Sequence, residues 1–186
     1  MSAKQILVTL LTTVFFADVA VFAQLTAPTN TVTLVGTTSV ATTDKVTLTV
    51  VKADSEEISG QDGKAANAVD GNPNTFWHTQ WQDANPAHPH EIIIKLSEPA
   101  TIKGFTYLPR QDDSENGTIK DYEFYVSDDG KEFGESVKKG SLESGKEMKT
   151  VTFEPRKCGY IKLRAMSEIN GEAWTSAAEI GIVQAD

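Results

Sequence analysis

Residues 88–96 read HPHEIIIKL and contain the clearest strand signal in the sequence. The apolar run at 91–96 includes three consecutive isoleucines and is bounded by His-Pro-His before it and Ser-Glu-Pro after it. Short β-branched runs between turn-forming residues are typical of buried strands. We therefore expect a core strand over residues 91–96.

Similar short segments lie on both sides of this strand. Apolar and polar residues alternate along them, which is typical of strands with one buried face. Asp-Asp-Gly at 128–130 marks a turn after one of them. The further segments expected to be strands are 46–52, 102–108, 119–127, 148–153, 160–164 and 179–183. Strands at this spacing, without a convincing helical stripe between them, predict an all-β fold, either an antiparallel sandwich or a barrel.

The amino terminus has the composition of an export signal. Residues 1–23 contain Lys4, an apolar run at 6–16 and small residues up to Ala23, which is the pattern of a signal peptide. A buried helix is the alternative. Residues 24–45, rich in Thr, Val and Ala, are expected to be a linker or a loosely held N-terminal segment. We therefore expect a secreted, periplasmic or cell-surface protein whose folded domain is 46–186.

The charge balance argues against several kinds of partner. The chain has 26 Asp and Glu against 17 Lys and Arg, a net charge of -9. Such a chain repels phosphate backbones and anionic lipid, so neither nucleic-acid binding nor membrane insertion is expected. The single cysteine, Cys158, has no second cysteine with which to form an internal disulfide.

Catalytic motifs are missing from the sequence. It has no nucleophile elbow, no phosphate-binding glycine loop and no dinucleotide fingerprint, so we expect no enzymatic activity. The acidic pairs Glu56-Glu57 and Asp112-Asp113 are interpreted as solvated loops.

Three histidines, His78, His88 and His90, allow a zinc site to be considered. Histidines two residues apart point to the same side of a strand, as zinc coordination by His88 and His90 would need. The alternative, in which His-Pro-His only caps the start of strand 91–96, is favoured because no supporting carboxylate or cysteine lies at a suitable spacing.

Residues 67–77, NAVDGNPNTFW, form an oxygen-rich segment around a glycine. Calcium takes six to eight oxygen ligands, often including backbone carbonyls. Asp70 offers a carboxylate, and Thr75 offers a hydroxyl and a carbonyl. A single loop rarely completes such a shell, so a distant carboxylate is expected. The alternative is a simple turn with Asp70 as its cap.

The order of several motifs resembles a known family. The discoidin, or coagulation factor V/VIII C-type, domain is similar to the chain over about residues 50–184, and its bacterial branch, carbohydrate-binding module family 32, is most similar. The motifs are NAVDGNPNTFWHT, HPHEIIIKL, GFTYLPRQ, NGTIKDYEFYVSDDG, GYIKLRA and AWTSAAEIGI. The resemblance implies a β-sandwich jelly roll of the galactose-binding-domain-like type with one structural calcium. It implies as calcium ligands the carbonyls of Asn67, Asn72 and Ala178, the carboxylates of Asp70 and Glu179, and both oxygens of Thr75.

The same resemblance implies a sugar site on the loops at one end of the sandwich. Its residues are His78, Trp81, Arg110, Asn116 and Trp174. Aromatic rings stack on the C–H face of a sugar, while His, Arg and Asn side chains bond its hydroxyls. The acidic loop 111–115 repels anionic sugars and so favours a neutral one.

Plainer interpretations of these residues stay open. Arg110 can pair with an acidic neighbour, Asn116 with the following glycine can form a turn, and Trp174 can fill space beneath the calcium loop. Trp77 is expected in the core rather than at the ligand.

The leading hypothesis is a non-catalytic exported module that binds glycans with a terminal neutral sugar of galactose type. The alternatives are a discoidin domain for protein–protein contact or matrix adhesion, with a protein partner, and a small hydrolase. Lipid binding is the least favoured, because of the acidic charge.

Overall fold

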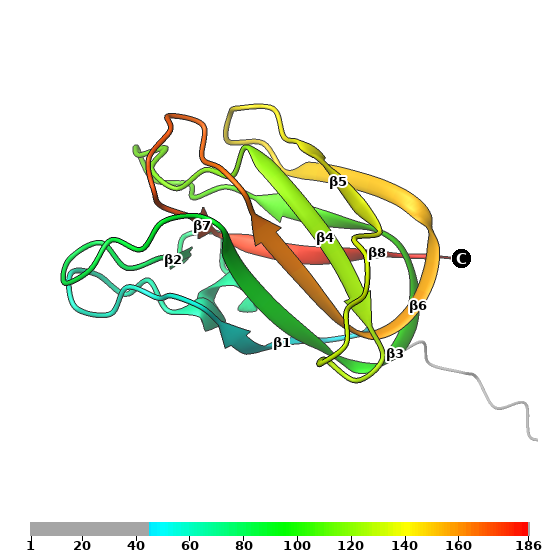
Figure 1. Ribbon diagram of the computed structural model, residues 1–186. Helices are drawn as coiled ribbons and strands as arrows, with labels where there is room; N and C mark the ends of the chain where they lie inside the picture. The colour runs from blue at the N-terminus through cyan, green and yellow to red at the C-terminus, as the bar shows by residue number, and fades with distance from the viewer. Residues whose placement is uncertain (1–44, 186) are drawn as a thin grey trace, which may run out of the picture. The chain divides into compact units, whose positions relative to one another are not determined.

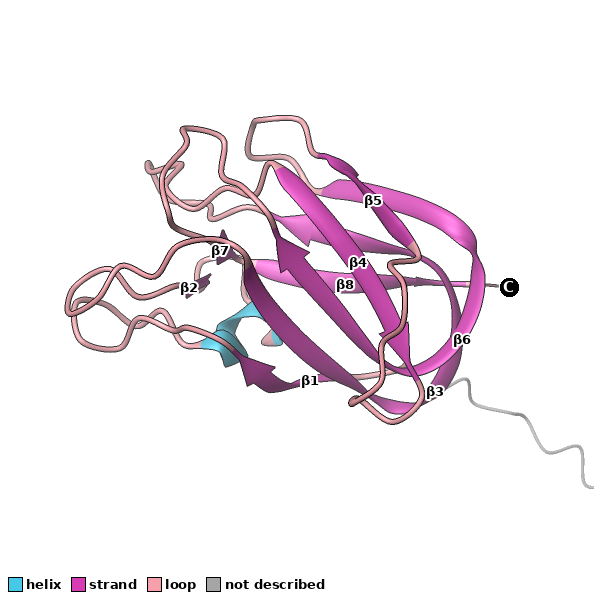
Figure 2. Cartoon of the chain, viewed as in Figure 1, coloured by secondary structure: helices cyan, strands magenta, loops and turns pink. Residues whose placement is uncertain are grey.

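The computed structural model describes residues 45–185, which form an antiparallel β-sandwich (Figures 1 and 2). In chain order the elements are β1 (Leu48–Ala53), the 3-10 helix η1 (Ala65–Val69), β2 (Trp77–His78), β3 (His90–Leu108), β4 (Asp121–Ser127), β5 (Lys138–Ser141), β6 (Lys149–Ala165), β7 (Ser176–Ala177) and β8 (Glu179–Gln184). The predicted signal peptide (1–23), and the predicted linker (24–45) except its last residue, lie outside the described residues.

Two long strands, β3 and β6, pass from one layer of the sandwich to the other. The first part of β3 pairs with β1 and with the end of β6, whereas its last part pairs with β8 and with the start of β6. The register between β3 and β6 shifts between these parts, and such irregularities bend a strand. Figure 1 shows both strands curving around one side of the fold. All the strand ladders are antiparallel, so the predicted fold class is confirmed.

The continuity of the long strands differs from the prediction. Segments 91–96 and 102–108 are parts of one strand, β3, and segments 148–153 and 160–164 are parts of β6. Pro99 in the Ser-Glu-Pro break lies where the β3–β6 pairing skips from Lys95 to Ala100. Since no ladder bond to β6 is needed there, the missing N–H of proline is tolerated. The predicted strands do not include β2, β5 and β7, because these strands are too short to show a periodic pattern.

The core lies between the two layers and is aromatic at its centre. The rings of Phe105 and Phe124 stack with centroids 4.3 Å apart, and Ile92 and Leu163 are among the buried neighbours. Trp77 is 1% exposed, as expected, and donates its indole N–H to the Ser55 carbonyl at 2.8 Å.

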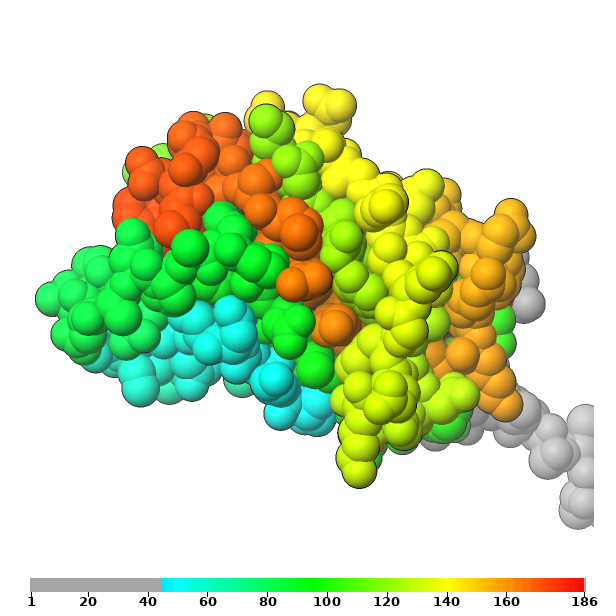
Figure 3. Space-filling view, in the orientation of Figure 1, coloured from blue at the N-terminus to red at the C-terminus, as the bar shows by residue number. Residues whose placement is uncertain are grey.

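Loops from distant parts of the chain gather at the end of the sandwich where β2 and β7 pair (Figure 1). Segments near residues 80–90 and 166–175 lie against each other there in the space-filling view (Figure 3), as the contact between His90 and Ala173 also requires. Among the described residues, no helix is long and apolar enough to cross a membrane.

Candidate functional site

The gathered loops enclose a pocket of about 210 Å³. All five residues expected to bind a sugar line it, although they are spread over almost one hundred positions of the sequence. The lining consists of His78, Trp81, Arg110, Asn116 and Trp174, together with Gln61 and Ser114. The fold therefore brings the predicted set together in one concave site.

His78 offers a neutral hydrogen-bond acceptor to this pocket. It is 2% exposed, and its Nδ1 lies 2.6 Å from the carbonyl oxygen of Thr79. Because a carbonyl only accepts, Nδ1 carries the ring proton. Burial lowers the pKa of His78, and the positive charge of Arg110 acts in the same direction. The ring is therefore neutral at pH 7, with Nε2 as the acceptor.

Arg110 lines the pocket and is also paired with an acidic neighbour. Its Nε and Nη2 donate to the two carboxylate oxygens of Asp112 at 2.7 and 2.5 Å. Its guanidinium carbon lies 4.2 Å from the ring centroid of Phe76, and its Nη1 donates to the carbonyl of Asn116 at 3.4 Å. This bidentate pairing fixes the plane of the guanidinium and lowers the pKa of Asp112.

Trp81 is held by a buried carboxylate, that of Glu57, which corrects the interpretation of Glu56-Glu57 as a solvated loop. Glu57 is 0% exposed. Its Oε1 accepts the backbone N–H groups of Ser59 and Gly60 and its Oε2 those of Trp81 and Gln82, each at 2.8 Å. Burial alone would raise the pKa of Glu57, but these four bonds outweigh it and lower the pKa to about 2. Glu57 thus joins two loops of the pocket.

Replacing Glu57 with glutamine is expected to lower the free energy of unfolding at pH 7 by about 2 kcal/mol, because two backbone N–H groups lose their acceptor. The folded-state pKa lies below the ordinary value of 4.5. The carboxylate therefore stabilises the fold above pH 4.5, and this contribution is lost as the pH falls towards about 2. Urea unfolding between pH 2 and 7 measures it.

Glu56→Gln is the matched control, since Glu56 is exposed and accepts a single backbone N–H within residues 45–185, from Ala65. An equal loss of stability in the Glu56 and Glu57 variants would contradict this role of Glu57.

Two lining residues have a buried side-chain donor with no partner among residues 45–185, namely Nε1 of Trp174 and Nε2 of Gln61. An unpaired buried donor costs about 1–3 kcal/mol. The rings of Trp174 and His78 are 6.3 Å apart, so the indole is a wall of the pocket. Gln61 was missed by sequence reasoning, because a single glutamine between glycine-containing turns has no distinguishing spacing.

The loop expected to bind calcium curls around Asp70. Its Oδ1 accepts the backbone N–H of Asn72 at 2.8 Å, and its Oδ2 accepts the Thr75 hydroxyl at 2.7 Å. Burial and the neighbouring Asp70 charge raise the pKa of Glu179. One Glu179 oxygen, Oε1, is buried and has no partner within the part of the chain that the structure describes. Two close carboxylates with an orphaned oxygen fit a cation.

Backbone oxygens must supply much of such a shell. Within residues 45–185 no group of three or more His, Cys, Asp or Glu side chains is placed to hold a metal. Asn67 lies in η1, at the start of the 67–77 segment, and Ala178 directly precedes Glu179. The carbonyls named by the resemblance therefore belong to segments next to the two carboxylates.

The zinc interpretation of the three histidines has no support, because no metal-holding group of His, Cys, Asp or Glu side chains is found within residues 45–185. Both nitrogens of His90 contact other protein acceptors, and Nε2 of His88 contacts the Thr175 hydroxyl at 3.1 Å. His90 is the first residue of β3, in agreement with the favoured alternative.

The amino-acid sequence matches a known domain family. The model of the F5/8 type C domain matches residues 50–180. A sialidase of Micromonospora viridifaciens is 37% identical over 147 residues, covering 78% of this chain and 23% of the sialidase. A galactose oxidase of Gibberella zeae is 41% identical over 129 residues, covering 68% of this chain and 19% of the oxidase. The chain thus spans less than a quarter of either relative.

Solved structures similar to this chain include family 32 carbohydrate-binding modules. A CBM32 module of Clostridium perfringens in complex with GalNAc-β-1,3-galactose has a TM-score of 0.66 and 34% identity, covering 73% of this chain and 94% of that one. The family 32 module of NanJ from the same species, in complex with galactose, has a TM-score of 0.62 and 34% identity, covering 73% and 92%.

Proposed function

The chain belongs to the F5/8 type C domain family, and we propose that its β-sandwich is a non-catalytic carbohydrate-binding module for terminal neutral sugars of galactose type. The observation that carries this proposal is the pocket lined by His78, Trp81, Arg110, Asn116 and Trp174. Its volume of about 210 Å³ is below the roughly 300–1,000 Å³ typical of drug-sized ligands, so it suits a single sugar ring.

The pocket offers both kinds of contact that a sugar needs. The indoles of Trp81 and Trp174 provide apolar faces for the C–H side of the ring. Nε2 of His78 accepts from a hydroxyl, while Arg110 and Gln61 donate. Modules that are 34% identical hold galactose and GalNAc-β-1,3-galactose in their structures, which supports a ligand of the same class.

The charges around the pocket favour a neutral ligand. Asp112 already neutralises the guanidinium of Arg110, so no unpaired cation is available from this residue for a carboxylated sugar. Asp113 and Glu115 are exposed on the same loop. Sialic acid and uronates are therefore repelled.

Calorimetric titration of the full chain with galactose and N-acetylgalactosamine tests the proposal. We expect dissociation constants in the micromolar to millimolar range, because stacking of about 1 kcal/mol per ring and a few hydroxyl bonds are offset by immobilisation. Glucuronate is the charged control. The absence of heat with every neutral sugar at millimolar concentration would refute the function.

Replacing Gly60 with alanine is expected to weaken galactose binding about fivefold. A methyl group at this position would lie 2.6 Å from Cη2 and 2.7 Å from Cζ2 of Trp81, so the indole must move out of its stacking position. Calorimetry measures the change. Ser59→Ala is the control, because it keeps the backbone N–H that is bonded to Glu57. If Gly60→Ala binds galactose with unchanged affinity, Trp81 does not contribute to sugar binding.

A structural calcium is the second part of the proposal. Its ligands would be the carboxylates of Asp70 and Glu179, with oxygens of Asn67, Asn72, Thr75 and Ala178. When bound, the ion would neutralise two carboxylates that otherwise repel each other. The orphaned Oε1 of Glu179 supports this assignment.

Export is the third part. It rests on the signal-like composition of residues 1–23. Amino-terminal sequencing of the protein recovered from culture medium or cell envelope tests it, since cleavage near Ala20 or Ala23 is expected.

A further inference from the structure

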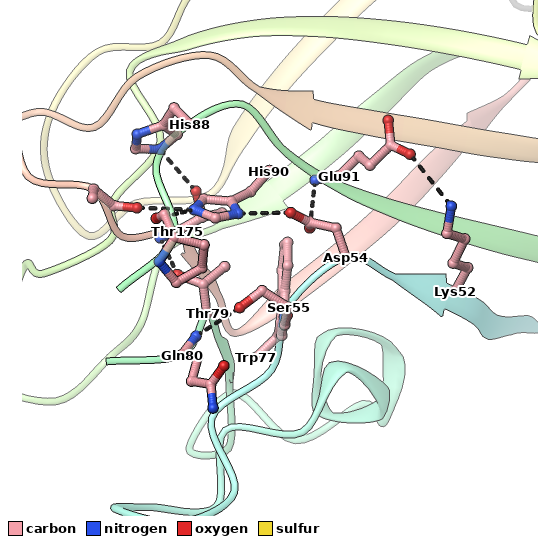
Figure 4. A network of polar contacts seen from close by, with 12 residues as sticks. Lys52, Asp54, Ser55, Trp77, Thr79, Gln80, His88, His90, Glu91 and Thr175 are labelled. Atoms are coloured by element: carbon pink, nitrogen blue, oxygen red, sulfur yellow. Dashed lines mark hydrogen bonds and ion pairs between the residues drawn. The ribbon is translucent and has the colours of Figure 1, made fainter. Parts of the chain in front are cut away.

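His90 is a buried imidazole with acceptors at both nitrogens (Figure 4). Its side chain is 0% exposed. Nδ1 lies 2.8 Å from a carboxylate oxygen of Asp54. Nε2 lies 2.9 Å from the carbonyl oxygen of Ala173 and 3.2 Å from that of Pro86. Carboxylate and carbonyl oxygens only accept, so both nitrogens must donate, and His90 is an imidazolium.

This imidazolium connects three segments of the chain. Asp54 directly follows β1, and its second oxygen accepts the backbone N–H of Glu91 at 2.8 Å. Pro86 belongs to the loop before β3. Ala173 directly precedes Trp174, whose indole lines the pocket. The carbonyl that accepts from His90 therefore belongs to the peptide bond between Ala173 and the backbone nitrogen of Trp174.

The charged and titratable groups nearest this imidazolium are few. Asp54 faces it from the end of β1, and the ring of His88 lies 5.0 Å away, centroid to centroid. The carboxylate of Glu91 lies 3.8 Å from Lys52 and 3.7 Å from Lys162. Pro86 and Ala173 contribute only carbonyls. Asp54 is thus the anion that holds the charge of His90.

We propose that His90, as an imidazolium held by Asp54, is a positioning residue for the sugar-stacking ring of Trp174. The proposal rests on the proposed function of that ring. While His90 is charged, Nε2 donates to Ala173 and fixes the backbone before the indole. When the ring loses a proton, Nδ1 or Nε2 faces an acceptor without a hydrogen, and the segment at 173–175 loosens.

The direction of the pH dependence follows from the contacts. Burial alone would lower the pKa of His90, but Asp54 and the two carbonyls outweigh it and raise the pKa above 6.5. The contacts are complete below pH 6.5 and are lost as the pH rises through the folded-state pKa. Burial lowers the pKa of His78 and of His88, so both rings lose their proton at lower pH than His90 does.

NMR and calorimetry of the full chain between pH 6.5 and 9.5 test the proposal. At pH 6.5 both ring nitrogens of His90 should give protonated ¹⁵N shifts. The indole N–H resonance of Trp174, assigned with Trp174→Phe, should move with the same midpoint as His90. Galactose affinity should fall about fivefold as the pH rises through this midpoint. Saturating galactose should raise the midpoint, because protonation of His90 and binding of galactose favour each other reciprocally.

Two variants sharpen the test. Asp54→Asn should move the midpoint to lower pH, because the anion that stabilises the imidazolium is gone. Glu91→Gln is the matched control and should leave the midpoint unchanged, because the Glu91 carboxylate lies near Lys52 and Lys162. If Asp54→Asn does not fold, the titration of the unmodified chain still decides the matter.

The outcomes are distinguishable. The positioning role is overturned if His90 is neutral at pH 6.5, or if the Trp174 indole N–H resonance does not move when His90 titrates. If no neutral sugar binds at any pH, the proposed function fails, while the Trp174 resonance still reports whether His90 positions the ring.

Discussion

Replacing Trp174 with alanine is expected to weaken galactose binding by about tenfold while the domain stays folded. The indole supplies a stacking face worth about 1 kcal/mol and an unpaired N–H donor, and about 1.4 kcal/mol corresponds to a factor of ten. The side chain is only half-buried, so its removal leaves the core intact. Calorimetry gives the affinity, and thermal unfolding checks the fold.

Trp174→Phe separates the two contributions. Phenylalanine keeps an aromatic face but lacks the N–H, so its affinity should lie between those of the native chain and the alanine variant. If Trp174→Ala binds galactose as tightly as the native chain does, the pocket is not the sugar site.

Removing calcium is expected to lower the melting temperature by about 5–10 °C. An ion present at one hundred times its dissociation constant stabilises a fold by about 2.7 kcal/mol, and each kcal/mol shifts the melting temperature of a domain of this size by roughly 2–4 °C. Scanning calorimetry with and without a chelator measures the shift, and elemental analysis counts the ion.

Glu179→Ala should abolish the response to the chelator, because it removes the carboxylate that faces Asp70. Glu172→Ala is the charge-matched control, since Glu172 is exposed and lies outside the calcium loop. A chelator without effect, together with no bound ion, would show that residues 67–77 form a simple turn.

The candidate site was predictable to different degrees. The five expected lining residues followed from a resemblance of motif order, whereas the calcium ligands implied by the same resemblance stay a prediction. Gln61 did not, because its role depends only on where its loop comes to lie. The burial of Glu57 was not predicted for a related reason, since Trp81 and Gln82, whose backbone N–H groups bond one of its carboxylate oxygens, lie more than twenty positions away.

The amino-acid sequence alone determined the β class and most strand positions, because apolar periodicity and turn residues are local properties of a chain. Only the tertiary structure decided that β3 and β6 run unbroken through both layers, that Glu57 is an internal anchor, and that His90 is charged. Each of these depends on partners supplied by distant segments, and hydrogen bonds between polar groups far apart in the chain leave no periodic trace along the sequence.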